Sequence, residues 1–412
     1  MTKRLVAIGD SHTYGAFASD FFSYPKYVAK AFGFDEMENY GVNGITICPE
    51  TDWRPTMANC EYIREFLPGD MAIITGSAND WIKNVDIGEV SDTSDKTFYG
   101  ALNILFARAK ERYKTVVVFS SINRLNDGLN KKGFTLQDYR NAVELKSKEF
   151  GFYFIDGTEF KVYPKEEESR KKLIPDGAHL NDLGQKLFTE FLIDKIHQLT
   201  GLPIQDFSFD NSEKKMVAMG DSITHGSGAG ESFGVVSNYF AKTVADHYGY
   251  ELKNYGTNGT TVAEQYEWRP TCSLCNYIEE TYKADVLLVP CGVNDYNRNI
   301  EIGKYEDTDK TTFYGALKIF FEKAKEKYKK IIVITPISKK NEQNKTKRGY
   351  CLQDFRDAIV KVAIRYGAFV IDGRNVPISG DDESVIPDGL HPNKEGHRIY
   401  GEYLVNELKN IL

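Results

Sequence analysis

The chain carries one set of short polar motifs twice, and this duplication limits its possible folds more than any other feature. The matching motifs lie between 211 and 215 residues apart in a chain of 412 residues. Solenoid repeats recur every ~20–50 residues, so a period of this length indicates two copies of a whole domain. We therefore predict one domain over residues 1–205 and a second over residues 206–412, joined within the polar segment 200–215. The motif pairs are Gly9-Asp10-Ser11 with Gly220-Asp221-Ser222, Asn39-Tyr40-Gly41 with Asn254-Tyr255-Gly256, Asn79-Asp80 with Asn294-Asp295, and Asp176-Gly177-Ala178-His179 with Asp388-Gly389-Leu390-His391.

Within each copy, short apolar runs alternate with longer segments of helical period. Continuous apolar runs bounded by Gly, Pro or Asp are typical of strands buried on both faces of a parallel sheet. The alternation predicts the α/β class: two tandem three-layer α/β/α domains of the flavodoxin-like type, each with a mainly parallel five-stranded sheet. The closing helix of copy one should bury Leu183, Leu187 and Phe191. The expected strands are 5–8, 71–75, 115–119, 152–155, 216–219, 286–289, 331–335 and 368–371, and the expected helices include 99–113, 182–198, 314–328 and 394–411.

Charge and hydropathy argue against nucleic-acid and membrane partners. Lys and Arg number 52 and Asp and Glu 59, so the net charge is −7 and neither copy offers the cationic face that binds a polyanion. No run approaches the ~18 consecutive apolar residues of a membrane span, and the first residues are typical of a strand rather than a secretory signal. We therefore expect a cytoplasmic protein with reduced cysteines; the sequence does not determine its oligomeric state.

A serine directly follows the first expected strand of each copy, at the ligand-binding edge of the predicted sheet. A serine hydroxyl is a poor nucleophile, so it needs an imidazole to take its proton and a carboxylate to hold that imidazole. An Asp-x-x-His sequence near the end of each copy offers both groups. Taken alone, it could be a helix-capping aspartate beside a surface histidine. Its occurrence twice, among only seven histidines, predicts two sites formed by Ser11, Asp176 and His179 and by Ser222, Asp388 and His391.

Acyl transfer also requires donors for the developing oxyanion. Gly44 and Gly259 can present backbone N–H groups, and Asn79 and Asn294 can present side-chain amides at the end of a strand. The alternative is that these residues are turn glycines and asparagines that bond their own turns. Asp10 and Asp221 are expected to organise their loops rather than act as acids.

The four motifs in this order resemble the SGNH (GDSL-type) hydrolase superfamily, and the resemblance covers essentially the whole of both copies. It implies nucleophiles at Ser11 and Ser222, bases at His179 and His391, orienting carboxylates at Asp176 and Asp388, and oxyanion donors at Gly44, Asn79, Gly259 and Asn294. Copy two follows the family pattern more closely. Copy one has His12, Ser77 and Leu180 where copy two has Ile223, Gly292 and Pro392, but every catalytic group is present in both.

The resemblance implies a serine esterase without metal or cofactor, which acts on a small-molecule or oligosaccharide ester; acetyl esters of carbohydrates are the expected substrates by family analogy. Aromatic and basic side chains after the glycine motif could contact the sugar, at Trp53, Arg54, Trp268 and Arg269. Three alternatives remain. They are a lipase or lysophospholipase of the same fold, a non-catalytic carbohydrate-binding or structural module, and a hydrolase in which Asp-x-x-His binds zinc, for which each copy has few further ligands.

Overall fold

The computed structural model describes residues 2–49, 58–228, 238–265 and 273–412. The chain forms two compact units, Met1–Asn211 and Ser212–Leu412. Residues 206–211, which the sequence analysis assigns to the second domain, therefore belong to the first unit. Asn211 Nδ2 donates to the Asp20 carbonyl (3.0 Å), and the Phe209 ring lies 4.8 Å from that of Tyr27. These contacts attach the segment to the first unit before the second begins.

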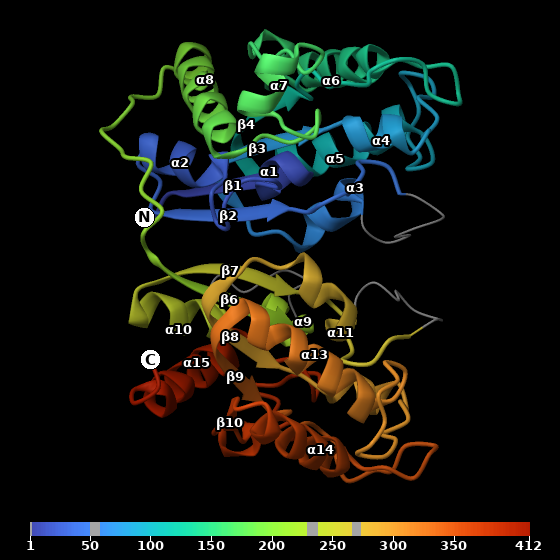
Figure 1. The fold of residues 1–412 in the computed structure, drawn as a ribbon, viewed down its shortest axis with the longest axis vertical. Coiled ribbons are helices and arrows are strands. Elements are labelled where there is room, and N and C mark those ends of the chain that lie inside the picture. Colours follow the sequence, from blue (N-terminus) through green and yellow to red (C-terminus); the bar gives the residue numbers. More distant parts are fainter. Residues whose placement is uncertain (1, 50–57, 229–237, 266–272) are drawn as a thin grey trace. The chain divides into compact units, whose positions relative to one another are not determined.

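A five-stranded sheet forms the centre of each unit in the described part of the chain (Figure 1). The strand order is β2-β1-β3-β4-β5 in the first unit and β7-β6-β8-β9-β10 in the second, and all paired strands are parallel. The predicted fold class is confirmed. The strands are β1 (Arg4–Gly9), β2 (Glu36–Gly41), β3 (Gly69–Gly76), β4 (Tyr113–Ser120), β5 (Tyr153–Ile155), β6 (Lys214–Gly220), β7 (Tyr250–Gly256), β8 (Ala284–Pro290), β9 (Tyr328–Ile334) and β10 (Phe369–Ile371).

Helices cover both faces of the first unit's sheet. Leu5 and Ala7 of β1 belong to one apolar core, shared with α2 and α8, whereas Val6 and Ile8 belong to a second core, shared with α5 and α6. This alternation follows from the two-residue period of a strand. The helices of this unit are α1 (Ser11–Tyr14), α2 (Tyr24–Ala31), α3 (Asn59–Tyr62), α4 (Ala78–Ile82), α5 (Phe98–Arg112), α6 (Leu136–Phe150), α7 (Glu167–Leu173) and α8 (Asp182–Thr200).

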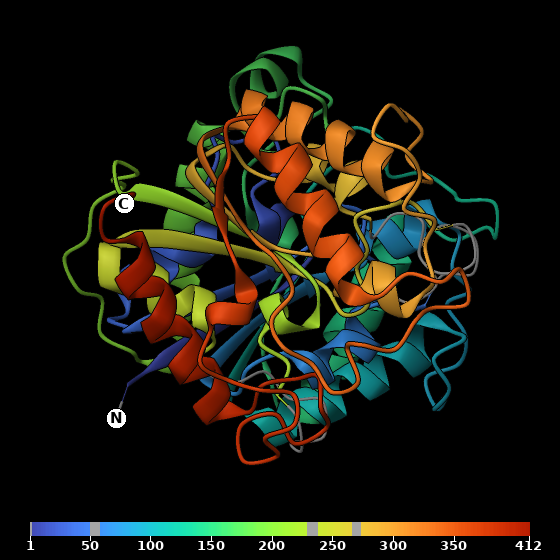
Figure 2. The same cartoon turned by 90° about the horizontal axis from the view of Figure 1, so that it is seen from below.

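The second unit repeats this arrangement. Helix α10 packs against α15, while α13 packs against α11 and α14. Figure 2 shows the red α15 apart from the orange α13 and α14. No described helix of either unit is long and apolar enough to cross a membrane. The helices here are α9 (Ser222–His225), α10 (Phe240–Tyr248), α11 (Leu274–Tyr277), α12 (Val293–Asn297), α13 (Phe313–Lys327), α14 (Leu352–Arg365) and α15 (Lys394–Leu408).

The buried face of α8 differs from the predicted one. The helix buries Phe188, Leu192 and Ile196, whereas Leu183 is 41% exposed. Leu187 and Phe191 pack only partly against the core. The four-residue steps of the prediction followed a neighbouring stripe of the same helix, because both stripes carry apolar residues.

Candidate active sites

Each candidate nucleophile is the first residue of a short helix that begins where a central strand ends. Asp10 caps the helix of Ser11, since its carboxylate accepts a hydrogen bond from the His12 N–H (3.0 Å). Asp221 caps the helix of Ser222 in the same way, at 3.0 Å from the Ile223 N–H. The two aspartates therefore organise their loops, as predicted. The N–H groups in the first turn of a helix have no partner within that helix and are available to an anion.

The repeated Asn-Tyr-Gly motif holds this short helix against the neighbouring strand. Asn39 Nδ2 donates to the Thr13 carbonyl (2.8 Å), and the Asn39 amide oxygen accepts from the Gly41 N–H (2.8 Å). Asn254 makes the same two bonds in the second unit, each 2.8 Å long. In the sequence this motif indicates only duplication; in the structure it joins the nucleophile helix to the end of an edge strand in both units.

The structure brings the predicted serine, histidine and aspartate of each unit into one hydrogen-bonded row. Ser11 Oγ lies 2.9 Å from His179 Nε2, and His179 Nδ1 lies 2.6 Å from Asp176 Oδ2. The distances in the second unit are the same: 2.9 Å from Ser222 Oγ to His391 Nε2 and 2.6 Å from His391 Nδ1 to Asp388 Oδ2. Such a row can carry a proton from the hydroxyl to the imidazole.

The aspartate is held by its own loop. Asp176 Oδ1 accepts hydrogen bonds from the backbone N–H groups of Ala178 (2.8 Å) and His179 (2.7 Å). Burial alone would raise the pKa of Asp176, but these bonds and the one from the His179 ring hold the pKa below its ordinary value. The same contacts lower the pKa of Asp388. An ionised carboxylate keeps the histidine Nδ1–H directed at it and leaves Nε2 facing the serine.

The first unit has a second buried histidine at its site. His12 Nδ1 lies 3.6 Å from Asp10 Oδ1, and His12 Nε2 is buried without a hydrogen-bond partner. The pKa of His179 is lowered by burial and next by His12, whereas Asp176 opposes the shift. Ile223 occupies the matching position in the second unit. The two sites therefore share their reactive row but differ in the residue that follows the serine.

In each unit the predicted oxyanion donors lie in the glycine loop and in a short helix, α4 or α12, and the loop and the helix contact each other. Gly44 and Gly259 have φ angles of 72° and 77°, a region that favours glycine. Asn79 Nδ2 donates to the Ile45 carbonyl (2.8 Å), next to Gly44. Asn294 Nδ2 donates to the Thr260 carbonyl (3.0 Å). An amide nitrogen has two protons, so each bond fixes the side chain and leaves one N–H for a ligand.

A buried carboxylate, to which the sequence-based prediction gives no role, connects the same helix and loop. Asp80 accepts hydrogen bonds from the backbone N–H groups of Ile47 and Cys48 at 3.0–3.1 Å. Burial raises the pKa of Asp80 to about 7, although these bonds lower it. Asp295 binds the matching loop of the second unit, and burial raises its pKa to about 7 as well. The Asn-Asp pair therefore combines a candidate donor with the anchor of its loop.

The predicted sugar-contact residues Trp53, Arg54, Trp268 and Arg269 lie outside the described residues. Within the described ranges, no three His, Cys, Asp or Glu side chains gather into a cluster that could hold a metal ion.

Comparison with known proteins identifies the family of both units. The model of the GDSL-like lipase/acylhydrolase family matches residues 7–187 and 218–399. A search of curated proteins found no match. A solved structure from Lactobacillus plantarum is 25% identical, with a TM-score of 0.41, over 49% of this chain and 100% of its own. The acetylxylan esterase Axe2 from Geobacillus stearothermophilus is 20% identical, with a TM-score of 0.35, over 48% of this chain and 94% of its own. With the family model matched over most of its length, this chain belongs to the GDSL-like lipase/acylhydrolase family and carries two tandem copies of its domain.

Proposed function

We propose that each unit is a serine esterase that hydrolyses small acyl esters, and that acetyl esters of carbohydrates are its substrates. One observation carries this proposal: a serine, a histidine and an aspartate form the same row in both units, with equal distances. Residues without a function would not be expected to form the same hydrogen-bonded row in both copies of the domain.

In the acylation step, Ser11 Oγ attacks the ester carbonyl while His179 Nε2 takes the hydroxyl proton. The negative charge that develops on the carbonyl oxygen is stabilised by the N–H groups of Ser11, Gly44 and Asn79. His179 then gives its proton to the leaving alcohol. The Asp176 carboxylate stabilises the imidazolium that exists between these two transfers and is not itself protonated.

In the deacylation step, a water molecule takes the place of the departed alcohol. His179 removes a proton from this water, which attacks the acyl-enzyme carbonyl, and then returns a proton to Ser11 Oγ. Ser222, His391 and Asp388 perform the same steps in the second unit.

The size of the cavity behind the second site supports a short acyl group. Ile223, Val293 and Leu390 help to line an apolar cavity of about 20 Å³. Among the described residues, a cavity of this volume has room for a small group such as a methyl but not for a long alkyl chain. The carbohydrate part of the proposal comes from family analogy.

Nucleophile variants of the full chain test the catalytic part. Hydrolysis of p-nitrophenyl acetate should fall in part with Ser11→Ala or Ser222→Ala, and by ~10³-fold or more with both together. Mass spectrometry after treatment with a serine-directed phosphonate should find two adducts per wild-type chain and one in each single variant. Equal rates for the wild type and the double variant would overturn the proposal and favour a binding module.

A series of acyl esters tests the substrate class. Acetate release from acetylated oligosaccharides and hydrolysis of acetyl esters should exceed hydrolysis of octanoyl and longer esters in kcat/KM. A preference for the long chains would replace the proposed function with that of a lipase or lysophospholipase.

A further inference from the structure

The first unit contains an open cavity beside its reactive row. The cavity has a volume of about 400 Å³ and is lined in part by Trp81, Arg124, Asn126, Lys131, Asp176 and Ala178. Trp81 follows Asn79 by two residues, and Ala178 directly precedes His179. The cavity therefore lies between the loop of the candidate oxyanion donor and the loop of the base, where the remainder of an ester bound at Ser11 would extend.

Arg124 is the unusual member of this lining. It is only 9% exposed, yet among the described residues its guanidinium makes no hydrogen bond and no ion pair. Its nitrogens are not fully enclosed, so the guanidinium reaches solvent and its donors are available to a ligand in the cavity. Burial lowers the pKa of Arg124, while the charges of Asp10 and Asp176 oppose the shift. An arginine keeps its proton at neutral pH, so this cavity has a cationic wall.

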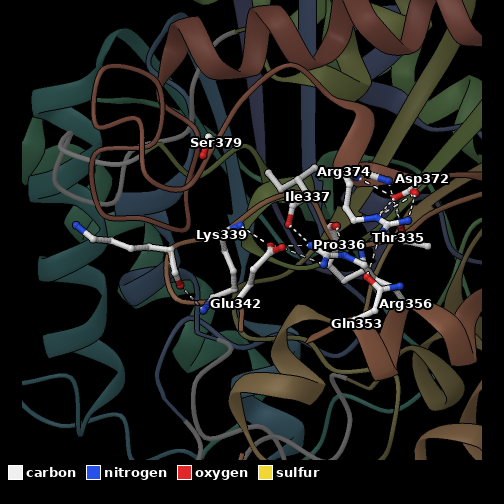
Figure 3. A network of polar contacts seen from close by, with 12 residues as sticks. Thr335, Pro336, Ile337, Lys339, Glu342, Gln353, Arg356, Asp372, Arg374 and Ser379 are labelled. Carbon is white, nitrogen blue, oxygen red and sulfur yellow. Dashed lines mark hydrogen bonds and ion pairs between the residues drawn. The ribbon is translucent and has the colours of Figure 1, made fainter. Parts of the chain in front are cut away.

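The second unit satisfies the matching position internally. Lys339 is the residue that matches Arg124. The residue after each of them donates its backbone N–H to the glycine of the Asp-x-x-His loop: Leu125 to the Gly177 carbonyl and Lys340 to the Gly389 carbonyl. Glu342 accepts hydrogen bonds from the Lys339 N–H (3.2 Å) and from Arg356 Nη2 (2.9 Å). Figure 3 shows Glu342 between Lys339 and Arg356. The ammonium group of Lys339 donates to the Lys340 carbonyl (3.0 Å).

In the first unit the residues that match Glu342 and Arg356 are Asp127 and Arg140, and neither bonds the side chain of Arg124. Asp127, the acid in its version of this loop, accepts from Lys165 Nζ (3.0 Å). Arg140 donates to the carbonyls of Ser121 (2.9 Å) and Ile122 (2.7 Å), as Arg356 does to the matching carbonyls of its own unit. The Asp127 carboxylate is therefore engaged by Lys165 and not by Arg124. Within the described parts of the two units, the side chain at this position therefore has a hydrogen-bond partner in the second unit and none in the first.

We propose that Arg124 binds a carboxylate group of the substrate, so that the first unit hydrolyses acyl esters of acidic sugars while the second hydrolyses esters of neutral ones. This inference rests on the proposed esterase function. The planar guanidinium can donate two parallel hydrogen bonds to a carboxylate. The Asn126 amide and the Lys131 ammonium offer further donors on the same wall, and Trp81 offers an apolar face to the sugar ring. The carboxylate of Asp176 also borders the cavity, but it is engaged by His179.

Full chains in which one of the two nucleophiles is replaced test this assignment. The Ser222→Ala chain leaves the first unit active and the Ser11→Ala chain leaves the second. Their substrates are O-acetyl glucuronic acid and its carboxamide, which differ only in the charge, and acetate release is the readout. The Ser222→Ala chain should prefer the acid by about 10- to 100-fold in kcat/KM, the size expected of hydrogen bonds to a charged group. The Ser11→Ala chain should show no such preference.

Arg124 variants in the Ser222→Ala chain assign the preference to this side chain. Arg124→Met should remove most of the preference for the acid, and Arg124→Lys, which keeps the charge but loses the planar fork, should reduce it. Lys132→Met is the matched control, because it removes a cation one residue beyond the cavity wall and should leave the preference unchanged. An equal loss on both substrates, or a preference that survives both Arg124 variants, would overturn the inference.

Inhibition gives a second readout that does not depend on the acetylated sugars. Glucuronate should inhibit p-nitrophenyl acetate hydrolysis by the Ser222→Ala chain more strongly than glucose or sulfate at equal ionic strength. Inhibition by sulfate equal to that by glucuronate would overturn the assignment to a carboxylate. If neither of these two chains hydrolyses any ester, the proposed function itself fails; if both do but the Ser222→Ala chain does not distinguish acid from carboxamide, only the Arg124 assignment fails.

Discussion

The imidazole rings of His12 and His179 lie 5.8 Å apart in the first unit, with their planes inclined by 34°. In the second unit Ile223 stands at the position of His12. His12 is one of the causes that lower the pKa of His179, after burial. The base of the first site therefore becomes neutral, and able to accept the serine proton, at a lower pH than it would without this neighbour.

Replacement of His12 should move the pH dependence of the first unit. His12→Ile in the Ser222→Ala chain removes a cause that lowers the pKa of His179, so this pKa rises and the acid limb of kcat/KM shifts to higher pH. The limb is measured with p-nitrophenyl acetate between pH 4.5 and 8. His197→Gln, which alters a histidine in the last turn of α8, should leave it in place. A limb that stays constant or moves to lower pH with His12→Ile would contradict the electrostatic role of His12.

Removal of the candidate oxyanion amides should reduce turnover rather than substrate binding. Because Asn79 Nδ2 is fixed by the Ile45 carbonyl and keeps one free N–H, Asn79→Ala in the Ser222→Ala chain should lower kcat by ~10²–10³-fold with little change in KM. Asn294→Ala should do the same in the Ser11→Ala chain. Asn103→Ala, which removes an amide that bonds the Asp92 carbonyl (2.6 Å), is the control. A change confined to KM would assign Asn79 to ground-state binding.

The buried carboxylate of Asp80 should make stability depend on pH. Its pKa of about 7 in the folded protein lies above its ordinary value of 3.8, so the folded state binds this proton more tightly than the unfolded state. The contribution of Asp80 to stability must then increase as the pH falls from 7 towards 4. Asp80→Asn does not titrate, so the wild type should gain urea resistance relative to this variant between pH 7.5 and 5.5, as followed by tryptophan fluorescence.

Asp86→Asn provides the control for this measurement. The hydrogen bond from Lys132 lowers the pKa of Asp86, so this exposed carboxyl does not change its charge between pH 7.5 and 5.5. The stability difference between wild type and Asp86→Asn should be constant over the interval. A constant difference for Asp80→Asn as well would show that Asp80 is ionised throughout.

Most of the fold could be predicted because each central strand contains a continuous apolar run. Strands β1, β3 and β4 lie between two helical layers, so their sequences contain the continuous runs that indicate burial on both faces. The edge strands β2 and β7 were missed for the opposite reason. Glu36, Glu38 and Asn39 of β2 are only half-buried, and a strand with polar residues on both faces does not differ from a loop in its sequence pattern.

The reactive groups could be predicted because duplication repeats them, whereas the groups around them could not. Ser11 and His179 stand in motifs that recur, but Arg124 and His12 have no identical counterpart and gave no signal by repetition. Their importance depends on burial and on missing partners, which are properties of the folded chain. Asp80 recurs as Asp295, and its burial could not be deduced from the repetition alone.

Gly41, at the end of β2, packs closely against the helix that begins with Ser11, and its replacement should lower activity by displacing that helix. A Cβ atom at Gly41 would lie 2.3 Å from the backbone nitrogen of Tyr14, in the helix that begins with Ser11. Because that neighbour is backbone, the helix must shift, and a displacement of ~1 Å at a reacting group can cost ~10²-fold in rate. Gly41→Ala in the Ser222→Ala chain should therefore lose about 10- to 100-fold in kcat/KM. Gly128→Ala, whose Cβ would meet nothing within 4 Å, should retain full activity. If Gly41→Ala proves as active as Gly128→Ala, the contact between β2 and the nucleophile helix does not position Ser11.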